Sequence, residues 1–471
     1  MAPFFNAPSA NTTPSANTAP SANTTPSANT APSANTAPSA NAAPSANTTP
    51  SANAAPSANT TLSSNATPSA NATLSSNVTP SANATLSSNA PSANATPSAN
   101  TTLSSNATPS AMLPPGSVIG LIGGGQLARM LAIAAAELGF RTVIFCPEAD
   151  CPAAQTANNH IVSSYDDTSA LDHFISQCDV VSYEFENLSL QTVQYVEKSK
   201  PVYPSSKALE ITQDRLFEKQ FLRDQGIGTA SWHAIDNSSS LLSALDTLGG
   251  RGLLKTRRFG YDGKNQIKLD HPNEQTLDEA LRTFQEQPCI LEEIVPFLSE
   301  ISVLSARTKQ GEHIFYDCPE NQHKHGILHK SFVPSHIPLD VQKAAQEISL
   351  TVMDALDYVG VLCIEFFVLT DGHLLVNELA PRVHNSGHWT QKACITSQFE
   401  QHIRAICGLP LGSPYRHSDC QMTNLLGNNF STLKYFLKQE HTSIHLYGKS
   451  TVHPHRKMGH VIQLLGPANK S

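Results

Sequence analysis

Residues 361–389 read VLCIEFFVLTDGHLLVNELAPRVHNSGHW, and the first part of this stretch predicts a β-hairpin. Residues 361–369 are mostly β-branched, aromatic or otherwise apolar, and Asp371-Gly372 is a two-residue turn signal. Residues 373–379 are then largely apolar again. The rest of the chain is best understood around this hairpin.

The predicted turn fixes which residues of the hairpin face each other. A two-residue loop pairs Thr370 with His373, and counting back places Glu365 directly opposite Glu378. Facing carboxylates repel each other, and on an otherwise apolar hairpin a bound cation removes that repulsion. Hard oxygen ligands suit Mg²⁺, and Asn377 offers a further oxygen. The alternative is an edge hairpin with its charges in water, although such an edge has no need of so many apolar neighbours.

A dense polar run follows the hairpin. The chain turns at Pro381, and residues 382–388 have neither helical nor strand periodicity. Such a run is typical of a loop that carries a functional site.

The chain divides into two parts of different composition. Residues 1–111 contain no Lys, Arg, Asp, Glu or Cys and consist of hexads such as PSANTT and TLSSNA, so we expect them to be disordered. The net charge of −8 therefore lies in residues 112–471, which are long enough for two or three subdomains. This mildly acidic balance favours neither nucleic acid nor a membrane as the main partner.

Two interpretations of the tract before Met112 stay open: a repeat expansion upstream of the functional start, or a targeting segment, although targeting segments carry Arg. The nine Cys are scattered without a CxxC pair or a close Cys–His cluster at zinc spacing. This predicts reduced thiols in a cytoplasmic enzyme, with an organelle as the alternative if the tract acts in targeting. The sequence contains no run of about 18 apolar residues, so it predicts no membrane span.

A β-α-β unit opens the second part. Residues 118–122 and 141–146 read as strands, and an apolar helix between them ends near Gly139. The turn before that helix, GGGQLA at residues 123–128, has the form G-x-G-x-x-A, so NAD binding is a candidate. The pattern alone is weak, because such a turn at a helix N-terminus can bind any phosphate or carboxylate.

Further periodic segments predict the other elements. We expect helices over residues 169–177, 190–197, up to 225, 339–358 and 396–406, and strands over residues 180–181, 202–203, 289–292, 300–307 and 444–447. The run YEFEN at 183–187 places Glu184 and Glu186 on one face at a strand end, which is the ligand edge of an open α/β sheet. A solvated loop is the alternative there.

Lys255 lies on a short predicted strand before a basic, Gly-rich loop, residues 260–266. This arrangement favours phosphate binding, since backbone N–H groups approach phosphates where Gly leaves room, and a basic surface hairpin is the alternative. Asn321, His323, His325 and His329 are expected in one loop. Their spacing suggests zinc, but no Cys or carboxylate completes a ligand set, so a structural or substrate role is favoured.

A strand lysine, a Gly-rich loop and two facing carboxylates together form a nucleotide–Mg²⁺ clamp. With these parts in place, residues 117–463 resemble the 5-(carboxyamino)imidazole ribonucleotide synthases, ATP-grasp enzymes of purine biosynthesis. The motifs that carry the resemblance are GGGQLARM at 123–130, YEFEN at 183–187, QDR at 213–215, KTRRFGYDGK at 255–264, EE at 292–293, HGIL at 325–328, NELAPRVHNSGHWT at 377–390, SQFEQHIRA at 397–405 and RKMGH at 456–460. The motif NELAPRVHNSGH is the most specific of them.

The resemblance implies an α/β fold of the ATP-grasp type with three domains behind the disordered tract 1–111. These are a Rossmann-like pre-ATP-grasp domain over 112–215, an ATP-grasp domain over 216–408 with a small lobe at about 226–292, and a small C-terminal domain over 409–471. We expect the last to be incomplete, because the family continues with a further strand and helix.

The resemblance also implies a site. The implied ATP-binding residues are Arg215, Lys255, Gly260, Tyr261, Asp262, Gly263, Lys264, Gln266, Glu292, Glu293, Ile294, Val295, Glu300, His323, Asn377 and Glu378. Those implied for the ribonucleotide and bicarbonate are Gln126, Leu127, Glu184, Tyr261, Asp262, Arg382, His384, Asn385, Lys449 and Arg456. Glu365 and Glu378 would hold Mg²⁺, with Mn²⁺ as the alternative, and the implied catalytic residues are Lys255, Arg382, Glu184, His384 and Asn385.

The implied reaction is the carboxylation of 5-aminoimidazole ribonucleotide with bicarbonate and ATP, through carboxyphosphate as the intermediate. The resemblance also implies a homodimer. The sequence departs from the family at Asn265 and Phe259, where the family has Gly, although Asn tolerates a left-handed backbone. The alternatives are a nucleotide-binding but catalytically impaired relative, an ATP-grasp ligase for another amine, and an NAD-dependent oxidoreductase.

Overall fold

The computed structural model describes residues 112–260, 265–285 and 287–468, and only the backbone of residues 428–430. The tract 1–111 and the loop residues Tyr261, Asp262, Gly263 and Lys264 lie outside the described residues, so the predictions made for them stay predictions. None of the described helices has the length and hydrophobicity of a membrane span.

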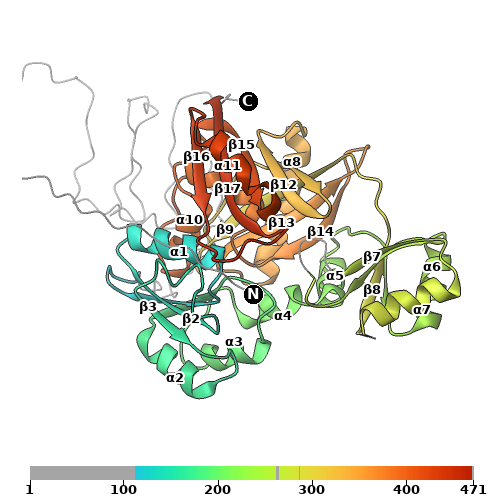
Figure 1. Ribbon diagram of the computed structural model, residues 1–471, viewed down its shortest axis with the longest axis horizontal. Coiled ribbons are helices and arrows are strands. Elements are labelled where there is room, and N and C mark those ends of the chain that lie inside the picture. The colour runs from blue at the N-terminus through green and yellow to red at the C-terminus, as the bar shows by residue number, and fades with distance from the viewer. Residues whose placement is uncertain (1–111, 261–264, 286, 469–471) are drawn as a thin grey trace, which may run out of the picture. The chain divides into compact units, whose positions relative to one another are not determined.

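The first sheet is parallel, with four strands in the order β3-β2-β1-β4, and Figure 1 labels β2 and β3 of this sheet. Its elements are β1 (Val118–Ile122), α1 (Gln126–Glu137), β2 (Arg141–Cys146), β3 (Asn159–Val162), α2 (Thr168–Gln177), β4 (Val180–Tyr183) and α3 (Leu190–Glu197). Ile119 and Leu121 of β1 pack in one core with α1, whereas Ile122 packs in another with α2 and α3. Because successive side chains of a strand alternate, both faces of the sheet are covered by helices. The predicted β-α-β unit is confirmed.

Two short helices, α4 (Ser206–Thr212) and α5 (Arg215–Asp224), follow where the sequence predicted one. The single-helix prediction was wrong because Asp214 has an extended backbone and caps α5, accepting a hydrogen bond from Leu216 N at 3.0 Å. The strand predicted at residues 202–203 is a single bridge between Val202 and Val181.

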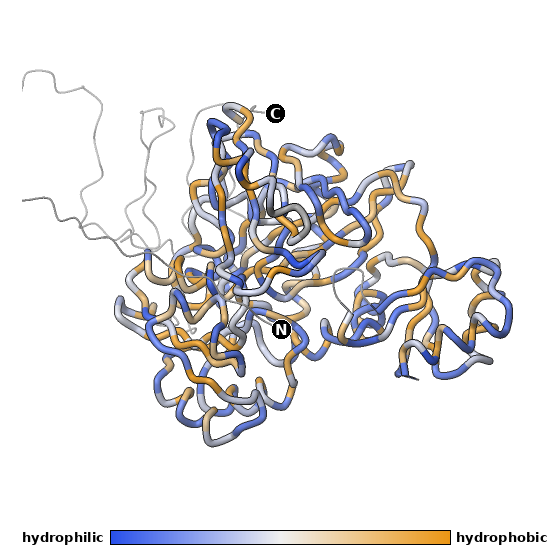
Figure 2. Tube along the Cα trace, in the orientation of Figure 1, coloured by the Kyte–Doolittle hydropathy of each residue, from blue (hydrophilic) through white to orange (hydrophobic). Residues whose placement is uncertain are grey.

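The second sheet is antiparallel, with four strands in the order β5-β8-β6-β7. Its elements are β5 (Trp232–Ile235), α6 (Ser238–Thr247), β6 (Arg251–Thr256), β7 (Gln266–Asp270), α7 (Glu274–Thr283) and β8 (Cys289–Glu292). Leu241 and Leu245 of α6 and Leu277 of α7 share a core with Leu254 and Leu291 of the strands. In Figure 2, hydrophobic stretches run along these strands, whereas the helices alternate between hydrophobic and hydrophilic residues.

The third sheet has nine strands, in the order β14-β13-β9-β11-β12-β15-β17-β16 with β10 paired to β9. Its strands are β9 (Ser299–Arg307), β10 (His313–Phe315), β11 (Glu320–Lys324), β12 (Ile327–Val333), β13 (Gly360–Val368), β14 (Leu374–Ala380), β15 (Ser418–Leu426), β16 (Thr442–Leu446) and β17 (Lys457–Pro467). Its helical segments are α8 (Leu339–Ala355), η1 (Asn385–Gly387), α9 (Thr390–Ala393), α10 (Gln398–Ile406), η2 (Gly427–Thr432) and α11 (Leu433–Phe436). The strands near the C-terminus thus extend the sheet that carries the β13–β14 hairpin.

The β13–β14 hairpin has the predicted pairing of Glu365 with Glu378, but a different turn. Leu369 N donates to His373 O at 2.9 Å, so the loop has three residues, 370–372, and not two. This slips the register by one residue near the turn. A bulge at Asn377 then restores the register, because Phe366 pairs with Val376 and Glu365 with Glu378.

The histidine-rich segment 321–329 is also not a loop. His323 lies in β11 and His329 in β12, and the two strands pair as a hairpin with His325 at its turn. His325 has a left-handed backbone with φ 54°, a conformation that the Gly326 beside it also adopts.

Candidate active site

One cavity of about 910 Å³ collects most of the residues predicted for the site. The predicted residues that line it are Gln126, Leu127, Glu184, Arg215, Lys255, Gly260, Gln266, Glu300, His323, Glu365, Asn377, Glu378, Arg382, His384, Asn385, Lys449 and Arg456. They come from all three sheets and the loops between them, so the fold brings together residues that lie far apart in the sequence.

Four predicted ATP-binding residues do not line this cavity: Glu292, Glu293, Ile294 and Val295. Lys255 Nζ donates a hydrogen bond to Glu292 Oε2 at 2.7 Å. Ser231 Oγ donates to Glu293 Oε2 at 2.8 Å. The structure therefore gives both carboxylates partners within the protein.

Glu365 and Glu378 face each other at the cavity wall, with His384 beside them. One donor atom from each lies within 4.8 Å of the other two, and His384 Nε2 is 3.8 Å from Glu365 Oε1. Burial and the Glu378 carboxylate raise the pKa of Glu365 to about 7. Burial and the Arg382 guanidinium hold the pKa of His384 well below its usual value, so its imidazole is neutral. These donors and this charge suit a divalent cation.

Two buried residues of α5, Glu218 and Lys219, form hydrogen bonds with the backbone of β14. The sequence analysis did not identify them as site residues. Lys219 Nζ donates to the carbonyls of Val376 at 3.3 Å and Asn377 at 2.7 Å. Leu379 N donates to Glu218 Oε2 at 3.1 Å, and burial raises the pKa of Glu218 to about 8. Lys219 therefore fixes the bulge that sets the Glu365–Glu378 pair. No sequence signal distinguishes it from an exposed helix lysine.

Lys255 is buried among charges of both signs. The ion pair with Glu292 is nearly inaccessible to solvent on both sides. Burial opposes ionisation of Glu292, but the cations of Lys219, Lys255 and Arg215 together lower its pKa to about 2. Arg215 Nη1 also lies 3.6 Å from Glu378 Oε2. The wall of the cavity thus carries two cations, of which Arg215 lies close to one of the facing carboxylates.

The glycine turn before α1 is occupied by a side chain of the protein itself. Glu184, at the end of β4, accepts hydrogen bonds from Gly125 N and from Ala128 N, the latter at 2.9 Å. A carboxylate at a helix N-terminus is stabilised by the exposed N–H groups and the helix dipole. Burial nevertheless raises the pKa of Glu184 above its usual value. Because Glu184 fills the position where a pyrophosphate would lie, the structure argues against the NAD alternative.

Arg382 is held in place by Glu186, a residue that the sequence analysis placed beside Glu184 but did not assign to the site. Arg382 Nε and Nη2 donate to the two oxygens of Glu186 at 2.5 and 3.0 Å. Such a bidentate pair fixes the plane of the guanidinium. Burial opposes the charge of Glu186, but Arg382 lowers the pKa of that carboxyl below its usual value.

The loop after β14 is supported by buried polar side chains. Gln398 Nε2 donates to His384 O at 2.7 Å, and Gln398 Oε1 accepts from His384 N at 2.8 Å. Ser386 Oγ bonds to Ser302 Oγ at 2.7 Å. Between them, the buried amide oxygen and nitrogen of Asn385 have no hydrogen-bond partner among the described residues. Since buried polar atoms are normally paired, this amide is available to a ligand in the cavity.

Among the described residues in and beside the Gly-rich loop, two that are not glycine have a left-handed backbone. Asn265 has φ 57° and Phe259 has φ 64°. Asn265 thus adopts the left-handed backbone that Asn tolerates, and its Nδ2 donates to Phe259 O at 3.1 Å. Phe259 lacks the local hydrogen-bonding that helps Asn, so its backbone is strained.

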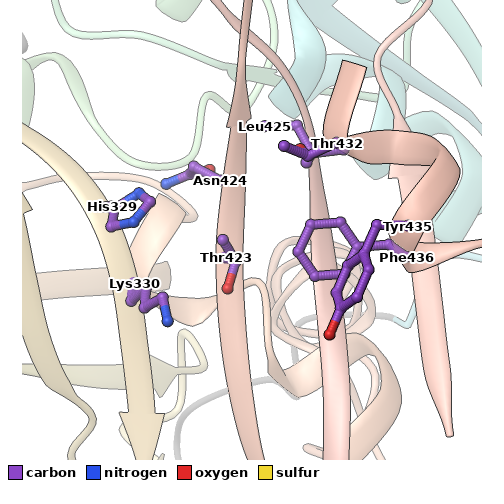
Figure 3. Close-up of a pocket in the computed structure, with 8 residues that line it drawn as sticks. All are labelled: His329, Lys330, Thr423, Asn424, Leu425, Thr432, Tyr435 and Phe436. Carbon is purple, nitrogen blue, oxygen red and sulfur yellow. The ribbon is translucent and has the colours of Figure 1, made fainter. Parts of the chain in front are cut away.

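The histidines of the β11–β12 hairpin separate in space. His323 lines the cavity, and its Nδ1 lies 2.8 Å from Glu300 Oε2. His329 instead lines a smaller hollow of about 240 Å³ between β12, β15 and α11, where it lies near Lys330, Tyr435 and Phe436 (Figure 3). Among the described residues these histidines form no cluster that could hold a metal ion. None of the residues predicted for the site lines this smaller hollow.

The segment between β16 and β17 closes another side of the cavity. Lys449 Nζ donates to Lys457 O at 2.8 Å, and Arg456 Nη1 donates to Thr451 O at 2.9 Å. The cavity is also lined by His453, His455 and Lys457. The sequence showed only that this segment is basic, and not that these residues belong to the site.

Two aromatic residues at the cavity were missed altogether. Phe297 and Phe367 stack with ring centroids 4.7 Å apart and planes 10° apart. Phe367 belongs to the predicted strand, and Phe297 follows β8 in a segment without a repeating pattern. Their stacking depends on tertiary structure, so no local signal reveals it.

Family profiles match three consecutive segments of the chain. The profile of the ribonucleotide synthetase preATP-grasp domain matches residues 117–213, and that of the ATP-grasp domain matches residues 220–399. The profile of the phosphoribosylaminoimidazole carboxylase C-terminal domain matches residues 420–468. The predicted fold class is confirmed, whereas the domain boundaries placed at residues 215 and 408 stay predictions.

Individual relatives agree with the profiles. The N5-carboxyaminoimidazole ribonucleotide synthase of Brucella melitensis is 51% identical over 352 residues, which are 75% of this chain and 97% of the relative. The crystal structure of an N5-carboxyaminoimidazole ribonucleotide synthetase with ADP matches with a TM-score of 0.72 at 42% identity, over 75% of this chain and 94% of the other. The synthase of Aspergillus clavatus, solved with ADP and 5-aminoimidazole ribonucleotide, matches with a TM-score of 0.70 at 28% identity, over the same shares.

Proposed function

Because this chain belongs to the N5-carboxyaminoimidazole ribonucleotide synthases, a family of ATP-grasp ligases, we propose how the residues of its cavity share the work of that reaction. The reaction is the ATP-dependent carboxylation of 5-aminoimidazole ribonucleotide with bicarbonate, in purine biosynthesis. Its products are 5-(carboxyamino)imidazole ribonucleotide, ADP and phosphate. The resemblance stated from the sequence is confirmed.

The facing pair Glu365 and Glu378 carries the proposal. Two negative charges that face each other across paired strands in a buried place repel, unless a cation lies between the carboxylates. The residues fit Mg²⁺, or Mn²⁺, because the two carboxylates offer the oxygen ligands that Mg²⁺ prefers, with the His384 imidazole beside them and Asn377 also lining the cavity. When bound, the ion neutralises the charge of ATP phosphates during phosphoryl transfer.

Cationic side chains surround the place where the phosphates of ATP would lie. Arg215 and Lys255 line the cavity, with Arg215 near Glu378, and Gly260 and Gln266 flank the loop that would cover the phosphates. Lys255 supplies a positive charge from a fixed position, since Glu292 holds its ammonium group. We propose that the stacked rings near this wall and the pair of His323 and Glu300 bind the nucleoside end.

The chemistry requires that bicarbonate, a poor electrophile, be activated. We propose that ATP phosphorylates it to carboxyphosphate and that Arg382, oriented by Glu186, stabilises the charge that develops on the transferred group. The exocyclic amine of the ribonucleotide then attacks the activated carbon, and phosphate leaves. His384 is neutral and Asn385 has an unpaired amide, so both are suited to orient the bicarbonate by hydrogen bonds.

The ribonucleotide needs a site for its 5′-phosphate. We propose Lys449 and Arg456 for this role, with Gln126 and Leu127 of the glycine turn beside the ribose or base. Glu184 then acts by holding the turn in shape. Closure over these groups protects the intermediate from water.

The decisive experiment measures ADP release by the purified protein with Mg-ATP and bicarbonate, with and without 5-aminoimidazole ribonucleotide. We expect release that depends on the ribonucleotide, and Glu378→Gln should lower it by at least about 100-fold, as expected for loss of an electrostatic contact to the transition state. Asp371→Asn, at the exposed turn of the same hairpin, is the matched control and should leave the rate unchanged.

Release that is independent of the ribonucleotide would favour a ligase for another amine. No release from a folded protein that binds ATP would favour the catalytically impaired relative. A homodimer and a cytoplasmic location, both expected from the sequence, stay predictions.

A further inference from the structure

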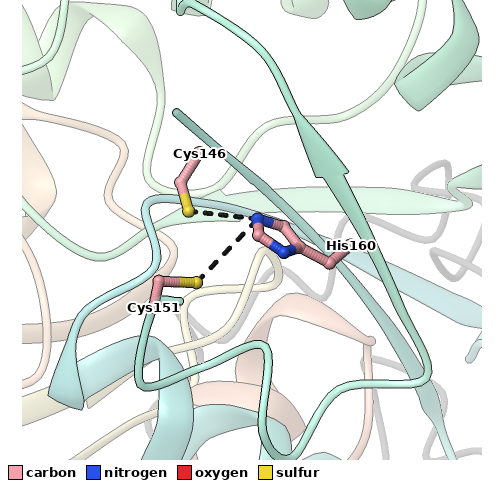
Figure 4. Close-up of side chains that lie close together, drawn as sticks. All are labelled: Cys146, Cys151 and His160. Atoms are coloured by element: carbon pink, nitrogen blue, oxygen red, sulfur yellow. Dashed lines mark hydrogen bonds between the residues drawn. The ribbon is translucent and has the colours of Figure 1, made fainter. Parts of the chain in front are cut away.

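Cys146, Cys151 and His160 lie together at one end of the first sheet (Figure 4). Cys146 is the last residue of β2, and His160 lies in β3, which pairs with β2 in parallel. Cys151 lies in the connection between the two strands and turns back toward them. The scattered spacing of these residues in the sequence gives no sign of the group, because spacing along the chain does not report the β2–β3 pairing.

The donor atoms have the separation of ligands around one metal ion. His160 Nε2 lies 3.3 Å from Cys146 Sγ and 3.9 Å from Cys151 Sγ, and all three atoms lie within 4.8 Å of one another. Tetrahedral zinc, with Zn–S and Zn–N bonds of about 2.3 and 2.0 Å, places sulfur and nitrogen about 3.5 Å apart. The two observed distances lie on either side of this value.

The chemistry of the donors narrows the choice of ion. Two thiols and an imidazole are soft ligands, which select zinc and similar thiophilic ions over Mg²⁺ or Ca²⁺. Both cysteines are buried, whereas His160 is half-buried, so the open side of the group lies at the imidazole. Three protein ligands leave a fourth position for water, the arrangement of open zinc sites.

Burial of two cysteines in an apolar core is the plain alternative, and both do pack in the core around α1. Core packing alone does not direct the same ring nitrogen at both sulfurs. Among the described residues, the chain has no other group of Cys and His side chains with this geometry, although all nine cysteines are free thiols.

The group lies directly behind the glycine turn of the active site. A methyl group on Gly124 would collide with both sulfurs, so the turn rests on them. Ala153 N, two residues after Cys151, donates to Gly124 O at 3.0 Å. An ion held by the three side chains would therefore tie the connection between β2 and β3 to the turn whose next residues line the cavity.

We propose that Cys146, Cys151 and His160 form a binding site for a thiophilic divalent cation of the zinc class. Binding converts both thiols to thiolates, and their two protons pass to the solvent. Burial and the Cys151 thiol raise the pKa of the Cys146 thiol, so in the absence of an ion it stays protonated.

The test uses the full chain, purified with a non-thiol reductant, treated with a chelator and then titrated with Co²⁺ as a spectroscopic probe. We expect one Co²⁺ per chain with a thiolate-to-metal charge-transfer band, which Zn²⁺ removes by displacement. Oxygen ligands give no such band, so binding of Co²⁺ at Glu365 and Glu378 is distinguished.

Two variants locate the site independently. Cys151→Ser and His160→Gln should each lower the affinity for the Co²⁺ that gives the band by about 100-fold or more. Loss of a residue that only supports a metal ligand costs at most about this much. Cys178→Ser is the matched control, because Cys178 is also buried in this domain and bonds to Phe174 O at 3.1 Å but lies outside the group. Circular dichroism should show all three folded.

Absence of the band from the folded wild-type protein would overturn the proposal, as would a band that survives in both ligand variants. A mass lower by two hydrogens, with no uptake of metal, would also overturn it and identify the two cysteines as a disulfide-forming pair.

Discussion

Glu365 lies directly across the β13–β14 ladder from Glu378, and the bulge at Asn377 is what brings the two into register. If the strands paired without the bulge, the three-residue turn would place Asn377 opposite Glu365 and the second carboxylate on the other face of the strand. The geometry of the proposed metal site therefore depends on this bulge and on the residues that hold it.

The raised pKa of Glu365 predicts a pH-dependent affinity for Mg²⁺. The folded pKa of about 7 lies above the usual value of 4.5, so this group stabilises the metal-free fold at low pH. That contribution is lost as the pH rises from about 4.5 through 7, where the carboxyl must ionise in the buried site. Mg²⁺ binds the ionised form of Glu365. In the presence of ADP, the affinity of the protein for Mg²⁺ should therefore rise by up to about tenfold per pH unit below pH 7 and level off above pH 8.

Calorimetric titrations between pH 6 and 8 measure this affinity. Glu365→Gln should bind Mg²⁺ weakly with little dependence on pH. An unchanged pH dependence in that variant would assign the effect to another group, of which Glu218, with a pKa of about 8, is the first to consider.

Lys219→Met should destabilise the protein and weaken metal binding together. The variant keeps the apolar length of the side chain but leaves the carbonyls of Val376 and Asn377 without their buried donor. We expect a loss of about 2–3 kcal/mol in the free energy of unfolding, measured with urea, and a lower affinity for Mg²⁺. Lys207→Met is the control, since Lys207 also donates to a carbonyl, Ala355 O at 3.0 Å, but is exposed. Equal effects of the two variants would contradict the assigned role.

Glu184→Gln should affect the ribonucleotide more than ATP. It removes the negative charge that the N-terminus of α1 stabilises, so the glycine turn loses its fixed shape. We expect stability to fall by about 1–2 kcal/mol and KM for the ribonucleotide to rise, with KM for ATP nearly unchanged. Asp167→Ala removes the cap of α2, where Asp167 accepts from Ala170 N at 3.0 Å, and is the matched control. It should lower stability alone.

Phe259→Gly should make the protein more stable although it deletes a large side chain. Phe259 is 54% exposed, so little buried area is lost, and its φ of 64° costs about 1 kcal/mol or more for a residue other than Gly. We expect a gain of roughly 0.5–1 kcal/mol in chemical unfolding, reduced by the greater freedom of Gly in the unfolded chain. Asn265→Gly should change stability by less, because Asn already tolerates its conformation. A loss of stability on Phe259→Gly would show that the ring packs usefully against the loop.

Local patterns predicted three of the four strands of the first sheet and the helices that cover it, but only β9, β13, β14 and β16 of the nine strands of the third sheet. The β13–β14 prediction was right at Glu365 for a partly wrong reason, since the turn and the bulge are two deviations that cancel. The position of Glu184 after a buried strand indicated the edge of the sheet but left a solvated loop open, and the structure places Glu184 at the cavity. That it caps α1 required knowing that β4 lies next to β1, which no local pattern contains.

The misses have a common physical cause. The histidine hairpin was taken for a loop because its polar residues mask the strand alternation, and the pairing partners lie on β9 and β15. Lys219, Phe297 and the Cys146–Cys151–His160 group likewise acquire their roles only from neighbours distant in sequence. Tertiary contacts, and not propensity, decide such residues.

The carboxylate of Glu184 at the start of α1 also matters for inhibitor design. A compound shaped after the substrate but carrying an acidic group toward the glycine turn would meet a negative charge that already uses the available N–H donors. Neutral hydrogen-bond donors or a cationic group would find a partner there instead. Selective compounds for this pocket should therefore place their anionic end at the segment of Lys449 and Arg456 and keep the opposite end uncharged or basic.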